Sequence, residues 1–201
     1  MKYLQTNPII AILRGLQPSQ AENVGKLLYE AGIRVMEVPL NRANAFESIQ
    51  VLQSTMPKDV LIGAGTVVNQ SQLEQLQSMS VPLIISPNLD VEIVAKTLNC
   101  GLIPMPGVAT VSEAFNAYNL GARWLKLFPA ASYGESHLKA MLSVLPKEVN
   151  FVAVGGVDAT NIQSWLTAGA KAIGIGNSLF CEGDSYQQTK EKVAKFKNIF
   201  Q

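Results

Sequence analysis

The chain has 201 residues, of which 48% are hydrophobic and 15% are charged, so it can bury one sizeable core and suits a single domain over residues 1–201. Its 16 Lys and Arg residues and 15 Asp and Glu residues leave a net charge of +1. That balance, without runs of like charge, argues against a nucleic acid partner.

The sequence also argues against several other classes of protein. No apolar run is long enough to cross a membrane, and residues 1–8 lack the apolar core of a signal peptide. The spacing of Cys100 and Cys181 fits neither a metal pair nor a redox pair, so we expect a cytoplasmic protein with reduced thiols. A single histidine, His137, excludes a zinc site built from several histidines, and we expect it on an exposed helix face.

Short apolar segments recur along the chain, with starts ~20–27 residues apart, which leaves room for a strand, a helix and two tight loops in each repeat. In chain order the predicted strands are Pro8–Leu13, Ile33–Val38, Val60–Ala64, Pro82–Ile85, Leu102–Met105, Arg123–Phe128, Phe151–Val154 and Lys171–Ile175. Helix signals fill the segments between them. Pro18 opens the first helix, Ser112 precedes a later one, and Gly32, Gly121 and Gly169 follow three helix ends.

Eight alternating strand and helix units with almost continuously apolar strands predict an α/β fold, the closed (β/α)8 TIM barrel. The alternative is an open, doubly wound parallel sheet. Its dinucleotide-binding fingerprint is not supported, because Val68 and Leu179 stand where a third glycine would follow Gly63 and Gly174.

The active site of a TIM barrel lies at the C-terminal ends of its strands, so polar and glycine residues there are the candidates. They are Arg14, Glu37, Thr66, Ser86, Pro87, Asn88, Pro106, Gly107, Lys126, Gly155, Gly156, Gly176, Asn177 and Ser178. Each has an ordinary explanation, such as a cap, a tight turn or a loop arginine. Their common position at one end of the predicted barrel favours a functional site.

Lys126 stands in the middle of the apolar segment Arg123–Phe128. Period-two alternation places it on one strand face with Trp124 and Phe128. An unpaired ammonium group there would be costly, so the lysine should find a partner or lose its proton. A lysine that is neutral near pH 7 is a nucleophile that forms Schiff bases with carbonyl substrates. The alternative is a lysine that reaches solvent from the strand end and has no catalytic role.

Two further features accompany this lysine. Glu37 lies inside an apolar strand and is either a structural carboxylate, an ion-pair partner of Arg14 or a catalytic group. The glycine-containing loops 155–156 and 176–178 follow the last two predicted strands, where such barrels commonly bind phosphate. Glycine lets the backbone approach an anion closely, and amide groups at a helix start attract negative charge.

These residues belong to a set of motifs that resembles a known family. The chain resembles the small class I aldolases of 2-keto-3-deoxy-6-phosphogluconate (KDPG) and 2-keto-3-deoxy-6-phosphogalactonate (KDPGal) over nearly its whole length. The motifs, in family order, are Glu37-Val38-Pro39-Leu40, Gly63-Ala64-Gly65-Thr66-Val67, Ile85-Ser86-Pro87-Asn88, Pro106-Gly107 with Thr110, Leu125-Lys126-Leu127-Phe128-Pro129 and Val154-Gly155-Gly156-Val157.

The resemblance implies a homotrimeric barrel without cofactor or metal that cleaves a phosphorylated 2-keto-3-deoxy acid to pyruvate and glyceraldehyde 3-phosphate. It implies Lys126 as the Schiff-base lysine and Glu37 as the general acid/base, with Arg14 and Thr66 near the substrate's carboxylate. It further implies a pocket lined by Ser86, Pro87, Asn88, Pro106 and Gly107, and a phosphate on Gly155, Gly156, Gly176, Asn177 and Ser178.

The choice of sugar depends on one departure. Phosphogluconate-specific members of the family carry an arginine where this chain has Asn41. The galactonate branch resembles this chain at that position and at Ile12–Gly15. KDPGal is therefore the expected substrate, and KDPG is the second. Three alternatives stay open. They are cleavage of 4-hydroxy-2-oxoglutarate (KHG) in the same site, an isomerase or synthase barrel without a Schiff base, and a non-catalytic phosphosugar-binding protein.

Overall fold

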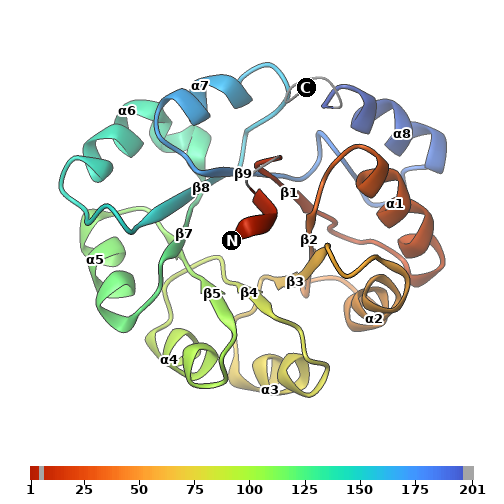
Figure 1. The fold of residues 1–201 in the computed structure, drawn as a ribbon, viewed down its shortest axis with the longest axis horizontal. Helices are drawn as coiled ribbons and strands as arrows, with labels where there is room; N and C mark the ends of the chain where they lie inside the picture. Colours follow the sequence, from red (N-terminus) through yellow and green to blue (C-terminus); the bar gives the residue numbers. More distant parts are fainter. Residues whose placement is uncertain (5–6, 197–201) are drawn as a thin grey trace.

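The computed structural model describes residues 1–4 and 7–196, which form a barrel of parallel strands surrounded by helices (Figure 1). Residues 5, 6 and 197–201 of the predicted domain lie outside the described part. The predicted (β/α)8 barrel is confirmed, and each strand is found within two residues of its predicted start. The fifth predicted strand is found at Ile103–Met105, and Pro106 interrupts the chain between it and a further two-residue strand, Gly107–Val108, which the sequence analysis did not predict.

The strands and helices alternate along the chain after a short 3-10 helix, η1 (Lys2–Leu4). The strands are β1 (Ile9–Ile12), β2 (Val35–Pro39), β3 (Leu61–Gly65), β4 (Leu83–Ile85), β5 (Ile103–Met105), β6 (Gly107–Val108), β7 (Trp124–Leu127), β8 (Asn150–Val154) and β9 (Ala172–Ile175). The helices are α1 (Pro18–Glu30), α2 (Ala45–Thr55), α3 (Gln70–Ser78), α4 (Val91–Asn99), α5 (Val111–Leu120), α6 (Ala130–Leu142), α7 (Ile162–Thr167) and α8 (Tyr186–Ala194).

The barrel closes through the interrupted strand. The strand order is β5-β4-β3-β2-β1-β9-β8-β7-β6, and the two end strands are consecutive in the chain. β5 pairs with β4, and β6 pairs with β7, so the segment around Pro106 joins both edges of the sheet. The Lys126 N–H donates to the Pro106 carbonyl at 2.9 Å, which continues this closure. All carboxyl ends of the strands therefore lie at one end of the barrel.

Alternate residues of each strand point to opposite faces, and this separates two apolar clusters. Ile9 and Ala11 of β1 belong to the cluster between the strands and the helices, whereas Ile10 and Ile12 belong to the barrel interior. The interior cluster also includes Leu4 of η1, with Met1 packed against it. Figure 1 shows the N-terminal segment in the centre of the ring of strands. It fills one end of the barrel, so the interior opens toward the other end.

The helix signals in the sequence correspond to observed helix ends. Pro18 is the first residue of α1, and Gly121 ends α5 in a left-handed conformation with φ 112°. The start of α5 differs from the prediction. Thr110 rather than Ser112 is its N-cap, since the Thr110 side chain accepts from the Glu113 N–H in a capping box.

The expected exposed position of His137 is wrong. Its ring is half-buried on α6, stacks on Tyr133 with centroids 4.9 Å apart, and places Nε2 2.7 Å from the Ala109 carbonyl oxygen. The loop after β6 provides this carbonyl acceptor, which the helical pattern could not indicate. Within the described residues, none of the helices is both long and apolar enough to span a membrane.

Candidate active site

Lys126 lies on β7 with its side chain in the barrel interior, as its position in the strand predicts. It is 7% exposed, and burial is the main cause that lowers the pKa of its ammonium group. The Glu37 carboxylate raises this pKa, and the Arg14 guanidinium lowers it. Nζ lies 4.6 Å from the centroid of the Phe128 ring, whose face attracts positive charge. Burial therefore favours the neutral amine, whereas the Glu37 carboxylate and the Phe128 ring favour the ammonium form.

Glu37 lies on β2, which places its carboxylate in the same interior. The residue is 2% exposed, and its buried Oε2 atom has no hydrogen-bond partner among the residues that the structure describes. Burial raises the pKa of Glu37 to about 7, although Lys126 and Arg14 both lower it. As a cap of backbone amides or an ion-pair partner of Arg14, Glu37 would have its buried oxygen bonded. Neither structural alternative therefore explains Oε2. A carboxyl group with a pKa near neutrality can both donate and accept a proton.

The space for this carboxylate depends on β3. A side chain at Gly65 would overlap the Glu37 carboxylate, with Oε2 as the nearest atom to its Cβ. Glu37 pairs with Gly63 across the parallel ladder, and Gly65 follows on the same face. The second glycine of the motif Gly63-Ala64-Gly65 therefore leaves room in the interior for one long polar side chain.

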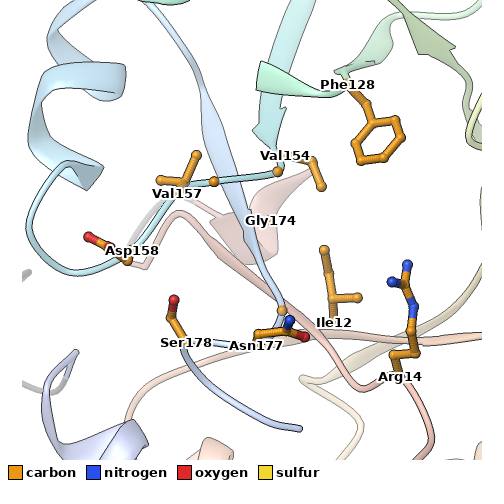
Figure 2. A pocket seen from close by; sticks show the side chains of 12 residues that line it. Ile12, Arg14, Phe128, Val154, Val157, Asp158, Gly174, Asn177 and Ser178 are labelled. Atoms are coloured by element: carbon orange, nitrogen blue, oxygen red, sulfur yellow. The ribbon is translucent and has the colours of Figure 1, made fainter. Parts of the chain in front are cut away.

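Lys126 and Glu37 line one small cavity, and a larger pocket adjoins it. The inner cavity is otherwise lined by apolar strand residues and one glycine: Ile10, Ile12, Ile85, Met105, Val152, Val154 and Gly174. Ile12, Val154 and Gly174 also line a pocket of about 310 Å³ at the carboxyl end of the strands (Figure 2). The outer pocket therefore lies next to the cavity of Lys126 and Glu37, with these three residues between them.

The residues that are predicted to bind phosphate line the outer pocket. It is lined by Gly155 and Gly156 after β8 and by Gly176, Asn177 and Ser178 after β9. Gly155 and Gly156 have φ values of 96° and 77°, a left-handed backbone that other residues rarely adopt. The Gly155 carbonyl accepts from the Ala131 N–H at 3.0 Å, and the Gly156 carbonyl accepts from Asn161 Nδ2 at 3.0 Å.

The direction of these carbonyl groups decides where the amide groups point. In a trans peptide the C=O and the following N–H point in opposite directions. Since the Gly155 and Gly176 carbonyls are bonded within the protein, the N–H groups of Gly156 and Asn177 point the other way. Neither N–H group has an acceptor in the described part of the chain. The loops can thus offer free donors to an anion without a charged side chain.

Arg14 and Asp158 are the charged residues of the outer pocket. Arg14 is exposed, and Figure 2 shows its guanidinium and the Phe128 ring extending toward one another from different sides of the pocket. Asp158 is a residue that the sequence reasoning missed. Its carboxylate accepts from the N–H of Thr160 at 2.8 Å and from its hydroxyl at 2.6 Å, which turns it toward its own loop. The outer pocket therefore has one cation, Arg14, without an ion-pair partner in the described part of the chain, and one carboxylate, Asp158, that is already hydrogen-bonded.

The remaining candidates lie at the same end of the barrel but outside the two cavities. Thr66 follows Gly65 with φ 56°, a rare backbone for a β-branched residue, and Ser86 is buried with its N–H donating to the Met105 carbonyl at 3.2 Å. Gly107 lies against the Pro87 carbonyl, and a side chain there would overlap it. The residues in this outside group are Asn41, Thr66, Ser86, Pro87, Asn88, Pro106 and Gly107.

The sequence reasoning also missed the apolar wall. Ile12, Val154 and Gly174 lie between the inner cavity and the outer pocket, whereas the candidates from the sequence are polar residues, glycines and two prolines. Period-two alternation provides the signal, since it assigns each of them to the interior face of its strand. Within residues 1–4 and 7–196 no group of three or more His, Cys, Asp or Glu side chains is placed to hold a metal ion.

Comparisons with known proteins agree with this geometry. Residues 1–197 match the family model described as "Aldolase: KDPG and KHG aldolase". The chain is 37% identical to 2-dehydro-3-deoxy-6-phosphogalactonate aldolase of Escherichia coli over 98% of this chain and 96% of that one. It is 31% identical to the KHG/KDPG aldolase of the same organism over 92% and 85%. A solved structure described as "Native KDPGal structure" superposes with a TM-score of 0.91 at 37% identity, covering 96% of this chain and 94% of that chain.

Proposed function

This chain belongs to the KDPG and KHG aldolase family and is a lyase, and we propose that it cleaves KDPGal to pyruvate and D-glyceraldehyde 3-phosphate. One observation carries the proposal. A buried lysine with a lowered pKa and a buried carboxyl group with a raised pKa line one cavity, which adjoins a glycine-walled pocket. Pairs of groups whose environments shift their pKa values in this way are typical of acid–base sites.

Lys126 forms the covalent intermediate in this proposal. Its neutral Nζ attacks C2 of the keto acid, and the keto oxygen leaves as water to give an iminium ion. Burial of Lys126 lowers its pKa and so increases the neutral fraction that can attack. The Phe128 ring, 4.6 Å from Nζ, stabilises the positive charge that the iminium retains.

Glu37 moves the protons. It takes the proton of the C4 hydroxyl, directly or through one water, as the C3–C4 bond breaks and its electron pair moves into the iminium. Glyceraldehyde 3-phosphate leaves, and the enamine is protonated at C3. Water then hydrolyses the pyruvyl iminium and restores Lys126. A pKa of about 7 suits Glu37 to both directions of transfer, and its unbonded Oε2 is available to substrate.

The outer pocket holds the phosphate in this proposal. The amide groups of Gly156 and Asn177, together with Ser178, face the end of the substrate remote from the reacting carbons. Binding energy gained there orients C2 and C4 against the inner pair. Arg14 and Thr66 would hold the carboxylate end, and Ser86, Pro87, Asn88, Pro106 and Gly107 would complete the pocket rim.

The sugar preference rests on two observations. The identity to the phosphogalactonate aldolase is 37%, compared with 31% to the KHG/KDPG aldolase. Asn41 is exposed after β2 and carries no charge toward the substrate. We therefore place KDPGal first and KDPG second, and KHG third because it lacks the phosphate that the outer pocket fits. A barrel enzyme without a Schiff base, or a non-catalytic binder, gives no reason for both Lys126 and Glu37 in an apolar interior.

We further propose a homotrimer. Large apolar side chains are exposed in the loops and helix starts that follow β3, β4, β6 and β7: Val68, Val91, Val111, Phe128 and Tyr133. A group of exposed apolar residues at one end of a barrel is typical of a contact between subunits. Light scattering coupled to size exclusion should give three times the 21.7 kDa chain mass, and a monomer at micromolar concentration would contradict this assembly.

Borohydride trapping with pyruvate tests the central proposal. Reduction should leave a pyruvyl adduct on Lys126, located by peptide mass mapping, while Lys139 on exposed helix α6 serves as an internal unlabelled control. A Lys126→Met variant should lose the adduct and the cleavage activity together. An adduct absent from every lysine, or cleavage by the methionine variant within tenfold of wild type, would reject the Schiff-base mechanism.

A further inference from the structure

The phosphate loop after β9 is held by a carboxylate that lies outside both cavities. This loop, residues 176–185, presents Asn177 and Ser178 to the outer pocket and ends at the start of α8. Leu179 and Phe180 anchor its first part, since they are 0% and 1% exposed in the core around the barrel. The remaining part has no such anchor, so polar contacts must fix its shape.

Asp184 provides these contacts. Its Oδ2 accepts from the Cys181 N–H at 2.7 Å and from Lys192 Nζ of α8 at 2.6 Å. Its own N–H donates to the Cys181 carbonyl at 3.0 Å, so the two residues are bonded in both directions. The Asp184 side chain is 11% exposed and that of Lys192 is 25% exposed. A pair that is largely shielded from water holds its geometry better than a surface ion pair.

Cys181 connects Asp184 to the part of the loop that lines the outer pocket. Its Sγ donates to the Asn177 carbonyl oxygen at 3.4 Å. Because C=O and N–H of one trans peptide are antiparallel, a carbonyl bonded on the Cys181 side directs the Ser178 N–H away from Cys181. That N–H has no acceptor in the part of the chain that the structure describes. The Asn177–Ser178 peptide is thus oriented by a residue that itself is bonded to Asp184.

We propose that Asp184 is a positioning residue for phosphate recognition, which acts through Cys181 to aim the Ser178 amide group at the substrate's phosphate. The inference rests on the proposed function of the outer pocket. It adds a residue that touches neither substrate nor the reacting pair. Loss of Asp184 should weaken binding of the phosphate end and leave the chemistry at Lys126 unchanged.

The test compares KDPGal with its dephosphorylated analogue, 2-keto-3-deoxygalactonate. Asp184→Ala should raise KM for the phosphorylated substrate about tenfold, the size expected for a weakened hydrogen bond to a charged group. kcat/KM for the analogue and pyruvate trapping on Lys126 should stay at wild-type values. Asp184→Asn keeps an oxygen acceptor for the Cys181 N–H, so it should recover most of the lost affinity.

Glu74→Gln is the matched control, because it breaks the 2.6 Å ion pair between Glu74 on α3 and Lys96 on α4. KM for KDPGal and KM for the analogue should both stay unchanged in this variant. If Asp184→Ala does not fold, Lys192→Met takes its place in the comparison of the two substrates. It removes the cation that holds the carboxylate, and it should raise KM for KDPGal alone.

Two results would overturn the proposal. If Asp184→Ala, or Lys192→Met in its place, keeps the wild-type ratio of the two KM values or loses activity equally on both substrates, then the positioning role is wrong. If wild type does not distinguish the two substrates at all, the phosphate site is wrong as well.

Discussion

The carboxylate of Glu37 lies directly against the backbone of Gly65, in space that any side chain at residue 65 would occupy. Gly65→Ala should therefore displace the carboxylate from the cavity that it shares with Lys126. We expect kcat to fall by about 10²–10⁴, the usual contribution of a general acid/base, and stability to fall by about 1–3 kcal/mol through overpacking. Steady-state kinetics and chemical unfolding measure the two effects separately.

Gly63→Ala is the control on the same strand. A Cβ at Gly63 would meet the flexible Leu83 side chain at 3.0 Å and leave Glu37 in place. We expect a similar loss of stability with kcat within a few-fold of wild type. Equal losses of kcat in the two variants would show that general crowding of the barrel, and not the position of Glu37, explains the alanine effect at Gly65.

Glu37→Gln should change the pH dependence of stability. Burial raises the pKa of Glu37 from 4.5 to about 7, so the folded protein holds this proton more tightly than the unfolded chain does. Wild-type stability must then fall as pH rises through this interval, by roughly 3 kcal/mol at about 1.4 kcal/mol per pKa unit. Glutamine does not titrate, so the variant should gain stability relative to wild type from pH 5 to pH 8.

Urea unfolding of both proteins at several pH values measures this difference. The same variant should still trap pyruvate on Lys126, while its turnover falls by about 10²–10⁴. A stability difference that does not depend on pH would mean that Glu37 titrates at an ordinary pKa in the folded protein. Normal cleavage by the variant would assign the proton transfer to another group.

The barrel and its buried interior lysine could be predicted from the sequence for a physical reason. Period-two alternation fixes the face of every strand residue, and one cationic residue in the apolar segment Arg123–Phe128 has few ways to satisfy its charge. The observed interior position of Lys126 follows from that pattern. The two glycine loops were accessible for a similar reason, since a barrel places all carboxyl ends of its strands together.

Other features depend on contacts between distant segments, which a local pattern does not contain. The position of His137 is set by the Ala109 carbonyl, and the closure of the barrel by the carbonyl of Pro106. The sequence does not show that the Glu37 carboxylate lies against Gly65, or that its Oε2 has no hydrogen-bond partner among the described residues. Thr66 is the clearest case, because a β-branched residue is among the least expected at positive φ.

Thr66→Gly tests whether this backbone strain supports function. Glycine adopts φ 56° without steric cost, and relief of strain offset by the entropy of the unfolded chain should stabilise the protein by about 1 kcal/mol. The variant also loses the hydroxyl group that the proposed function assigns to the substrate's carboxylate end, so kcat/KM should fall. Thr66→Ser keeps the hydroxyl and should keep most of the activity. A glycine variant that is less stable than wild type would show that Thr66 is not strained.

Ser178→Asp tests the phosphate site by charge. A carboxylate at this position in the outer pocket would face the substrate's phosphate, and like charges at this range should raise KM for KDPGal by about 10- to 100-fold. The dephosphorylated substrate should be cleaved as by wild type. Added salt should reduce the defect, since ions screen part of the repulsion.

The matched control is Ser71→Asp, which adds the same charge in the first turn of α3, outside the residues that line the outer pocket. It should leave both KM values unchanged, because the long-range field of one exposed charge is largely screened at physiological salt. Equal effects of the two variants would attribute the KM change to net charge. An unchanged KM for KDPGal in the Ser178 variant would place the phosphate elsewhere, and Arg14, a cation that lines the same pocket, would then be the first alternative to test.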